Sequence, residues 1–196
     1  MLEPKPRHIK LLRFGILLVV LCTLPISVFA ATIQVTSQID EPGCGLVDAI
    51  TTANSNTPTG VCIANNGSFT VGGRDLIVLN FAAPISEFLV SSVEGSSSGL
   101  PVISTDIKIL GRGGTAKVVI KRSEVPSTPD FRLFLVTGIG SLSLENISLR
   151  NGKLSTSSGG AILIQCGRLD IDNSEFVNNQ SPLGGALSLS NMMIGL

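Results

Sequence analysis

An internal repeat constrains the fold of this chain more than any other feature. Residues 141–151 match residues 168–178 at an offset of 27, and a second unit, residues 159–163, recurs as residues 184–188 at an offset of 25. The first match pairs like residues: Leu142 with Leu169, Leu144 with Ile171, Asn146 with Asn173, Leu149 with Phe176, and Asn151 with Asn178. Self-similarity of this period is typical of solenoids, whose short strands bury a face only by stacking on their copies.

The repeat predicts an all-β fold, a right-handed single-stranded parallel β-helix. Stacking successive units places like residue over like residue at about 4.8 Å, so the matched leucines would form columns of the core. The matched asparagines would form amide ladders at turns, because asparagine tolerates a left-handed backbone. A β-sandwich needs turns about every 8–12 residues but no constant repeat of this length.

The segment before the repeats predicts a cap on this β-helix. Its elements are expected to be a strand, a short helix, a second strand and a flexible loop: residues 31–37, 45–54, 75–81 and 91–99. In the helix, Leu46, Ala49, Ile50 and Ala53 recur at helical spacing and form one apolar face. We therefore divide the mature chain into a cap with the first strands, residues 31–99, and β-helix repeats, residues 100–196.

The first thirty residues have the layout of a secretory signal peptide. A basic front end is followed by an apolar stretch, residues 14–29, and then by the small residues Ala30 and Ala31. This order predicts cleavage after Ala30 and export, with the protein secreted or held at the cell surface or outer membrane. The alternative is an uncleaved anchor helix, but a span needs about 20 apolar residues and this stretch is shorter.

Charge and composition exclude several classes of function. Removing four basic residues and Glu3 from a balanced 14 and 14 leaves 10 basic and 13 acidic residues, a net charge of −3. That lacks the basic field that nucleic-acid binding needs, so we expect no nucleic-acid partner. The only histidine, His8, lies in the signal peptide, which excludes catalysis and metal ligation by imidazole in the mature chain. The absence of Trp and Tyr weakens a carbohydrate-binding role, because sugar rings commonly stack on these side chains.

Three cysteines remain in the mature chain. An exported chain meets an oxidising compartment, so we expect a disulfide between Cys44 and Cys62, which would contribute about 3 kcal/mol. The alternative is two free, buried thiols. Cys166 would then be the odd cysteine, packed as a small hydrophobe.

An acidic cluster is the strongest candidate for chemistry. With Leu169 and Ile171 facing the core, Asp170 and Asp172 would face outward about 6.6 Å apart, and Glu145 would stack on Asp172. Three carboxylates on one outer face could bind Ca²⁺ or act as an acid/base pair. The alternative, which we favour, is a solvated strand face partly neutralised by Arg168, with no catalytic residue, metal site or cofactor.

Two basic or glycine-rich features receive a structural interpretation. Residues 111–114, Gly-Arg-Gly-Gly, lack the lysine and the helix of a phosphate loop, so they are interpreted as a solenoid corner. Arg132 is expected to face outward from a strand with its charge in water.

The N-terminal segment resembles a known module. Residues 32–36, residues 44–54 and Cys62 are similar to the module named for its Cys-Ser-Leu-Arg-Glu-Ala signature, which heads many bacterial β-helix surface proteins. The chain keeps Cys44, Leu46 and Ala49 of that signature. It has Gly45, Val47 and Asp48 at the other three positions.

The downstream repeats resemble two related groups. Residues 131–136, 144–152 and 159–162 look like pectate-lyase-like (pectin-lyase fold) β-helix repeats, and residues 176–179 with 184–187 are similar to the repeat of polymorphic outer-membrane proteins. This resemblance implies a right-handed parallel β-helix that is secreted or lies on the cell surface, commonly with a C-terminal anchor. Residues 191–196 follow a Gly-Gly-Ala corner without an anchor or a capping repeat, so we expect an incomplete, truncated β-helix.

The expected function is that of an exported, surface-associated structural or adhesive module without catalysis of its own. Its partner would be a cell-surface or polysaccharide ligand, and it would meet the membrane only through the signal segment or a missing anchor. The alternative is a polysaccharide-active, pectate-lyase-like enzyme that is truncated or inactive. A third possibility is a gene fragment without a function of its own.

Overall fold

The computed structural model describes residues 30–37, 43–80, 87–112 and 114–190. The predicted signal peptide as far as Phe29 and the predicted truncated end, residues 191–196, lie outside these residues. One helix is described, α1 (Leu46–Ser55). The strands are β1 (Ala31–Val35), β2 (Asn66–Gly67), β3 (Asp75–Leu79), β4 (Glu87–Val90), β5 (Asp106–Gly111), β6 (Val118–Arg122), β7 (Phe134–Thr137), β8 (Ser141–Glu145), β9 (Ile147–Arg150), β10 (Ile162–Gln165), β11 (Arg168–Asp172), β12 (Glu175–Val177) and β13 (Leu187–Ser190).

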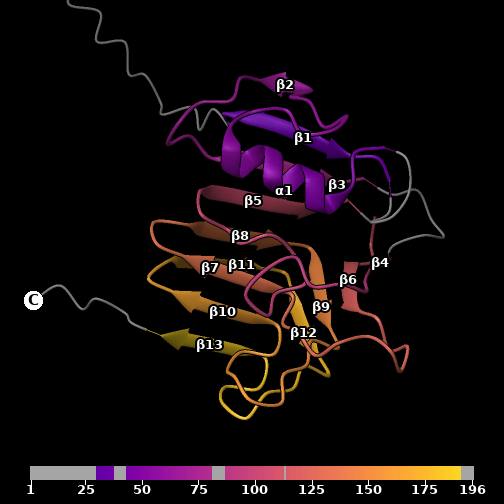
Figure 1. Ribbon diagram of the computed structural model, residues 1–196. Helices are drawn as coiled ribbons and strands as arrows, with labels where there is room; N and C mark the ends of the chain where they lie inside the picture. The colour runs from indigo at the N-terminus through magenta and orange to yellow at the C-terminus, as the bar shows by residue number, and fades with distance from the viewer. Residues whose placement is uncertain (1–29, 38–42, 81–86, 113, 191–196) are drawn as a thin grey trace, which may run out of the picture.

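The strands form three sheets, and within each sheet the neighbours come from successive turns of the chain. The orders are β11-β8-β5-β3-β1-β2, β13-β10-β7 and β12-β9-β6-β4, and every described pair is parallel except β1 with β2. The chain therefore winds as a β-solenoid of about four turns, with α1 across its N-terminal end and β13 at the opposite end (Figure 1). This confirms the predicted parallel β-helix.

The register is the one that the repeat predicts. Strand β11 pairs with β8 at the offset of 27, placing Leu169 on Leu142 and Ile171 on Leu144. Strand β13 pairs with β10 at the offset of 25, starting with Leu187 on Ile162. Because each strand is too short to bury a face alone, the core consists of these columns, and its middle rungs are fully buried.

The asparagine positions are turns, as predicted. Asn146, Asn151, Asn173 and Asn178 all have positive φ, between 41° and 62°. The amide Nδ2 of Asn173 donates to Oδ1 of Asn146 at 2.6 Å, which is one step of an amide ladder. Asparagine occurs here because its short polar side chain accepts the left-handed backbone that the tight turn requires.

The cap is held by the predicted helix and disulfide. Leu46, Ala49, Ile50 and Ala53 of α1 are all buried. Helix α1 contacts β1 and β3. Cys44 and Cys62 form a disulfide with their Cα atoms 4.7 Å apart, and both residues are buried. The predicted disulfide is confirmed.

Cys166 departs from the expectation. It is exposed, at a turn between β10 and β11, and is not packed as a small hydrophobe. Its φ of 58° interrupts the alternation of the strand, so the side chain that would have continued the pattern of β10 turns outward.

Residues 98–103 extend one of the sheets. Ser98 lies beside Arg132 and Ile103 beside Val136 in parallel bridges, and the N–H of Ile103 donates to the carbonyl of Leu135 at 2.8 Å. The predicted loop at residues 91–99 thus ends by packing along β7, with Ser98 and Gly99 buried. This placement forms one side of the hollow described next.

Candidate functional site

An open groove lies on the outer face of the sheet β7-β10-β13, and its volume is about 520 Å³. In a parallel stack, side chains that point outward on successive rungs lie directly over one another. Leu135 and Thr137 of β7 therefore stack on Leu163 and Gln165 of β10. Val102, on the segment beside β7, lines the same groove.

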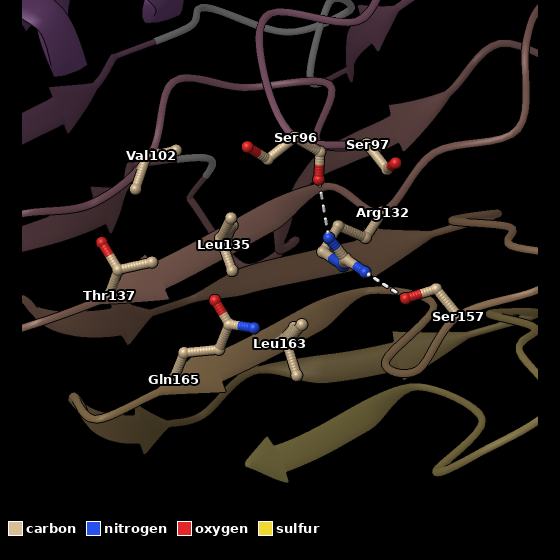
Figure 2. A pocket seen from close by; sticks show the side chains of 9 residues that line it. All are labelled: Ser96, Ser97, Val102, Arg132, Leu135, Thr137, Ser157, Leu163 and Gln165. Carbon is tan, nitrogen blue, oxygen red and sulfur yellow. Dashed lines mark hydrogen bonds between the residues drawn. The ribbon is translucent and has the colours of Figure 1, made fainter. Parts of the chain in front are cut away.

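The groove has three chemically different parts (Figure 2). Val102, Leu135 and Leu163 form an apolar floor, and Thr137 with Gln165 supplies a hydroxyl and an amide at one end. Arg132 occupies the other end, between Ser96 and Ser157. A ligand with both apolar and hydroxyl-bearing surface would find partners along this length.

Arg132 is the residue that sets the character of the groove. It is only 3% exposed, so the expectation that its charge lies in water is wrong. Its Nη1 donates to the carbonyl of Ser96 at 3.0 Å, and its Nη2 donates to Oγ of Ser157 at 3.0 Å and to the carbonyl of Ser158 at 3.2 Å. The burial has a tertiary cause, because two loops distant in sequence close over the guanidinium.

The charge of Arg132 has no anionic partner in the described chain. All three acceptors are neutral oxygens, Nε–H is buried without an acceptor, and no described carboxylate forms an ion pair with it. Burial disfavours the charged form and lowers the pKa of Arg132 from its usual value. A buried cation without a counter-charge is costly, so this end of the groove favours an anion.

A second buried arginine, Arg122, differs from Arg132 because it has a carboxylate nearby. Arg122 is 8% exposed and donates to the carbonyls of Ser123, Thr128 and Pro129. It also lies 3.4 Å from a carboxylate oxygen of Asp130 and over the ring of Phe131. The hollow of about 320 Å³ that Arg122 lines therefore holds an arginine that already has a carboxylate partner, which it shares with Lys153.

The predicted acidic cluster lies on a different sheet from the groove. Asp172 stacks on Glu145 in the register expected, on β11 and β8. Glu145 is bound by Lys108 at 2.5 Å, and Asp170 by Arg168 at 3.0 Å. These carboxylates are thus on the outer face as predicted, and two of the three are engaged by basic side chains.

The structure also locates a buried carboxylate that the sequence did not single out. Asp75, the first residue of β3, is 1% exposed and accepts a hydrogen bond from the N–H of Ala31 at 2.9 Å. Burial raises its pKa to about 6 against the lowering effect of that bond. Asp75 lies at the cap and does not line the groove.

The described residues contain neither a cluster of metal ligands nor a membrane-spanning helix. No three His, Cys, Asp or Glu side chains among them are grouped so as to hold a metal ion. Within the same residues, no helix is long and apolar enough to cross a bilayer.

Sequence reasoning missed the groove, and the available signal was weak. Arg132 stands between the apolar residues Phe131 and Leu133, which marks a buried strand position as much as an exposed one. Comparisons with protein-family models, with curated proteins and with solved structures found no match. The resemblance to Cys-Ser-Leu-Arg-Glu-Ala modules and outer-membrane repeats therefore stays a prediction, and the fold itself is that of a parallel β-solenoid.

Proposed function

We propose that this chain is an exported, surface-associated structural or adhesive β-solenoid module without catalysis of its own, and that it holds an acidic polysaccharide in the groove at Arg132. The observation that carries the proposal is the buried guanidinium of Arg132, which has no carboxylate partner among the described residues and stands at the end of an open groove. A sugar carboxylate would supply the missing counter-charge.

Two features support export. The Cys44–Cys62 disulfide is the kind of bond that persists in an oxidising compartment outside the cytosol. The predicted signal peptide, with cleavage after Ala30, gives the route.

The lining of the groove supports an acidic sugar as the ligand class. Thr137 and Gln165 offer hydrogen-bond donors and acceptors for hydroxyl groups, while Leu135 and Leu163 give the groove an apolar floor for the C–H face of a ring. This aliphatic floor takes the place of the aromatic platform that the composition lacks. Binding through one buried charge and a polar edge fits adhesion to a repeating polymer.

The same lining supports binding without turnover. Arg132 is the only charged residue that lines the groove, and none of the other lining residues is a carboxylic acid, a cysteine, a lysine or a histidine. Acid/base catalysis on a bound sugar needs carboxyl groups beside the scissile bond, and the candidates Glu145, Asp170 and Asp172 belong to another sheet.

The test is calorimetric titration of the mature protein with oligogalacturonate, oligomeric alginate and a neutral oligosaccharide of equal length. We expect binding of the acidic oligomers only. Arg132→Gln should weaken it by about 30-fold or more, because the ligand carboxylate loses its buried partner. Arg168→Gln, which removes one exposed charge on another face, is the matched control and should leave affinity unchanged.

Two outcomes would overturn the proposal. Equal affinity in Arg132→Gln and the parent protein would remove the groove as the site, provided that melting temperatures show both to be folded. Release of unsaturated products from pectate or alginate, with or without Ca²⁺, and lost in Asp172→Ala, would favour the enzyme over the module.

A further inference from the structure

One buried contact joins the first described strand to the rest of the sheet. The backbone nitrogen of Ala31 donates a hydrogen bond to Oδ1 of Asp75 at 2.9 Å. Ala31 is fully buried and Asp75 is 1% exposed. The next residues, Thr32 and Leu76, begin the parallel pairing of β1 with β3, so this bond closes the end of that pair.

The nitrogen in this contact belongs to the peptide bond where cleavage is expected. Hydrolysis there adds the oxygen of water to the carbonyl carbon of Ala30 and breaks the bond to the nitrogen of Ala31. Ala30 leaves as a carboxylate at the end of the signal segment, and the nitrogen takes up both protons of the water to become an ammonium group. The atom 2.9 Å from the Asp75 carboxylate is then an α-ammonium group in place of an amide.

We propose that processing after Ala30 converts the amide hydrogen bond into an ion pair between the α-ammonium group of Ala31 and the carboxylate of Asp75, and that this pair locks β1 into the sheet of the mature protein. This rests on the export part of the proposed function and is independent of the groove.

The surroundings of Asp75 leave room for such a partner. Strand β1 carries no charged side chain. On β5, Asp106 lies near enough to act on Asp75 by repulsion, and Lys108 is engaged by Glu145. Arg74, which precedes β3, is bound to Asp106 at 2.9 Å. Among the described residues, therefore, no lysine or arginine forms an ion pair with Asp75, and the α-ammonium group would be its first cation.

Cleavage also removes two hydrogen bonds. In the uncleaved chain the N–H of Ala30 donates to the carbonyl of Arg74 at 2.9 Å, and the N–H of Ser68 donates to the carbonyl of Ala30 at 2.5 Å. In the mature protein, the ion pair therefore takes the place of these two hydrogen bonds between neutral backbone groups. Charge-assisted hydrogen bonds are roughly twice as strong as neutral ones.

The first measurement is the reactivity of the α-amine in the secreted protein, after N-terminal sequencing has placed its start. An acylating reagent is applied across a pH series, and the Ala31 product is followed by mass spectrometry. Pairing with Asp75 keeps the amine protonated, so at pH about 8, near the ordinary pKa of an α-amine, we expect it to react about tenfold more slowly than in Asp75→Asn. Asp170→Asn removes a carboxylate on β11, four strands from β1 in the same sheet, and should react like the parent protein.

The second measurement is stability after the same amine has been acetylated. Acetylation should lower the melting temperature of the parent protein by about 2–6 °C, because it removes the positive charge of the α-amine and leaves the rest of the chain unchanged. It should leave Asp75→Asn unchanged, since the asparagine carbonyl still accepts a bond from a neutral N–H.

The possible failures are distinguishable. Equal reactivity of the parent protein and Asp75→Asn, or an equal effect of acetylation on both, would overturn the ion pair and leave export and the groove standing. A secreted chain that begins elsewhere than Ala31 would overturn both the predicted processing and the pair.

Discussion

At the N-terminal end of the solenoid, α1 and the Cys44–Cys62 disulfide cover the first rungs, whereas β11, β12 and β13 lie at the edges of the three sheets among the described residues. The repeat itself is buried to different depths on an inner strand, β8, and on the edge strand β11. Leu144 is fully buried, but Ile171, its partner in the next unit, is 43% exposed. A column position reaches full burial only when a neighbour covers it on each side, so similar local sequence does not give equal stabilisation.

The largest expected effect compares the two members of this column. Leu144→Ala should lower the free energy of unfolding by about 3–5 kcal/mol, because it removes buried methyl groups and leaves a cavity between two rungs. Ile171→Ala should cost less than half of that, since its side chain is already partly in water. Urea unfolding followed by circular dichroism measures both, and equal losses would break the comparison.

The cap should be stabilised chiefly by its covalent link. Replacing both Cys44 and Cys62 by serine should cost about 3 kcal/mol, since the closed loop of 18 residues no longer restricts the unfolded chain. Cys166→Ser, at an exposed turn, is the control and should stay within about 0.5 kcal/mol. Thermal unfolding of the three proteins gives the result, and a control as damaging as the double substitution would contradict the assignment.

A change of pH should affect stability with opposite sign through Asp75 at the cap and through Glu175 at the other end. Where Ala31 remains an amide, the raised pKa of Asp75 means that the folded state binds more protons than the unfolded state between pH about 4 and about 6. Stability should therefore fall over that window as pH rises, by on the order of 2 kcal/mol, and Asp75→Asn should abolish the fall.

Glu175, on the edge strand β12, has the opposite sign. Hydrogen bonds from Ser148 and Arg150 lower its pKa below the ordinary value of a glutamate. Its contribution is present above pH about 4.5 and is lost as pH falls through the lowered pKa. Over this acid range, the free energy of unfolding should depend less on pH in Glu175→Gln than in the parent protein, and denaturant unfolding at a series of pH values measures it.

The smallest effect concerns the turns. Asn146→Ala should cost about 1–2 kcal/mol, because alanine is strained at a φ of 57° and the hydrogen bond from the side-chain amide of Asn173 is lost. Asn146→Gly loses the same bond but accepts the backbone, so it should cost less. If glycine were the more damaging residue, the side-chain ladder and not the backbone would be the main contribution of asparagine here.

Much of the solenoid could be predicted from the amino-acid sequence. The offset of 27 gave the register of β8 with β11, and the offset of 25 gave that of β10 with β13. The buried face of α1 followed from helical spacing, and the disulfide followed from the expected export into an oxidising compartment. The outer placement of Glu145 and Asp172 was predicted for the same reason, because strand alternation decides which side chains face out.

The sequence by itself thus determined the stacking, because the offset between two matching units fixes which residues of successive strands lie over one another. Only the tertiary structure decided the environment of the charged groups. Arg132 is buried because residues 96 and 157–158, distant in sequence, close over it. Asp75 is buried beside Ala31 because β1 and β3 are neighbours in the sheet. These contacts join segments outside the repeat, so no periodicity encodes them, and the groove and the cap contact could be found only in the folded chain.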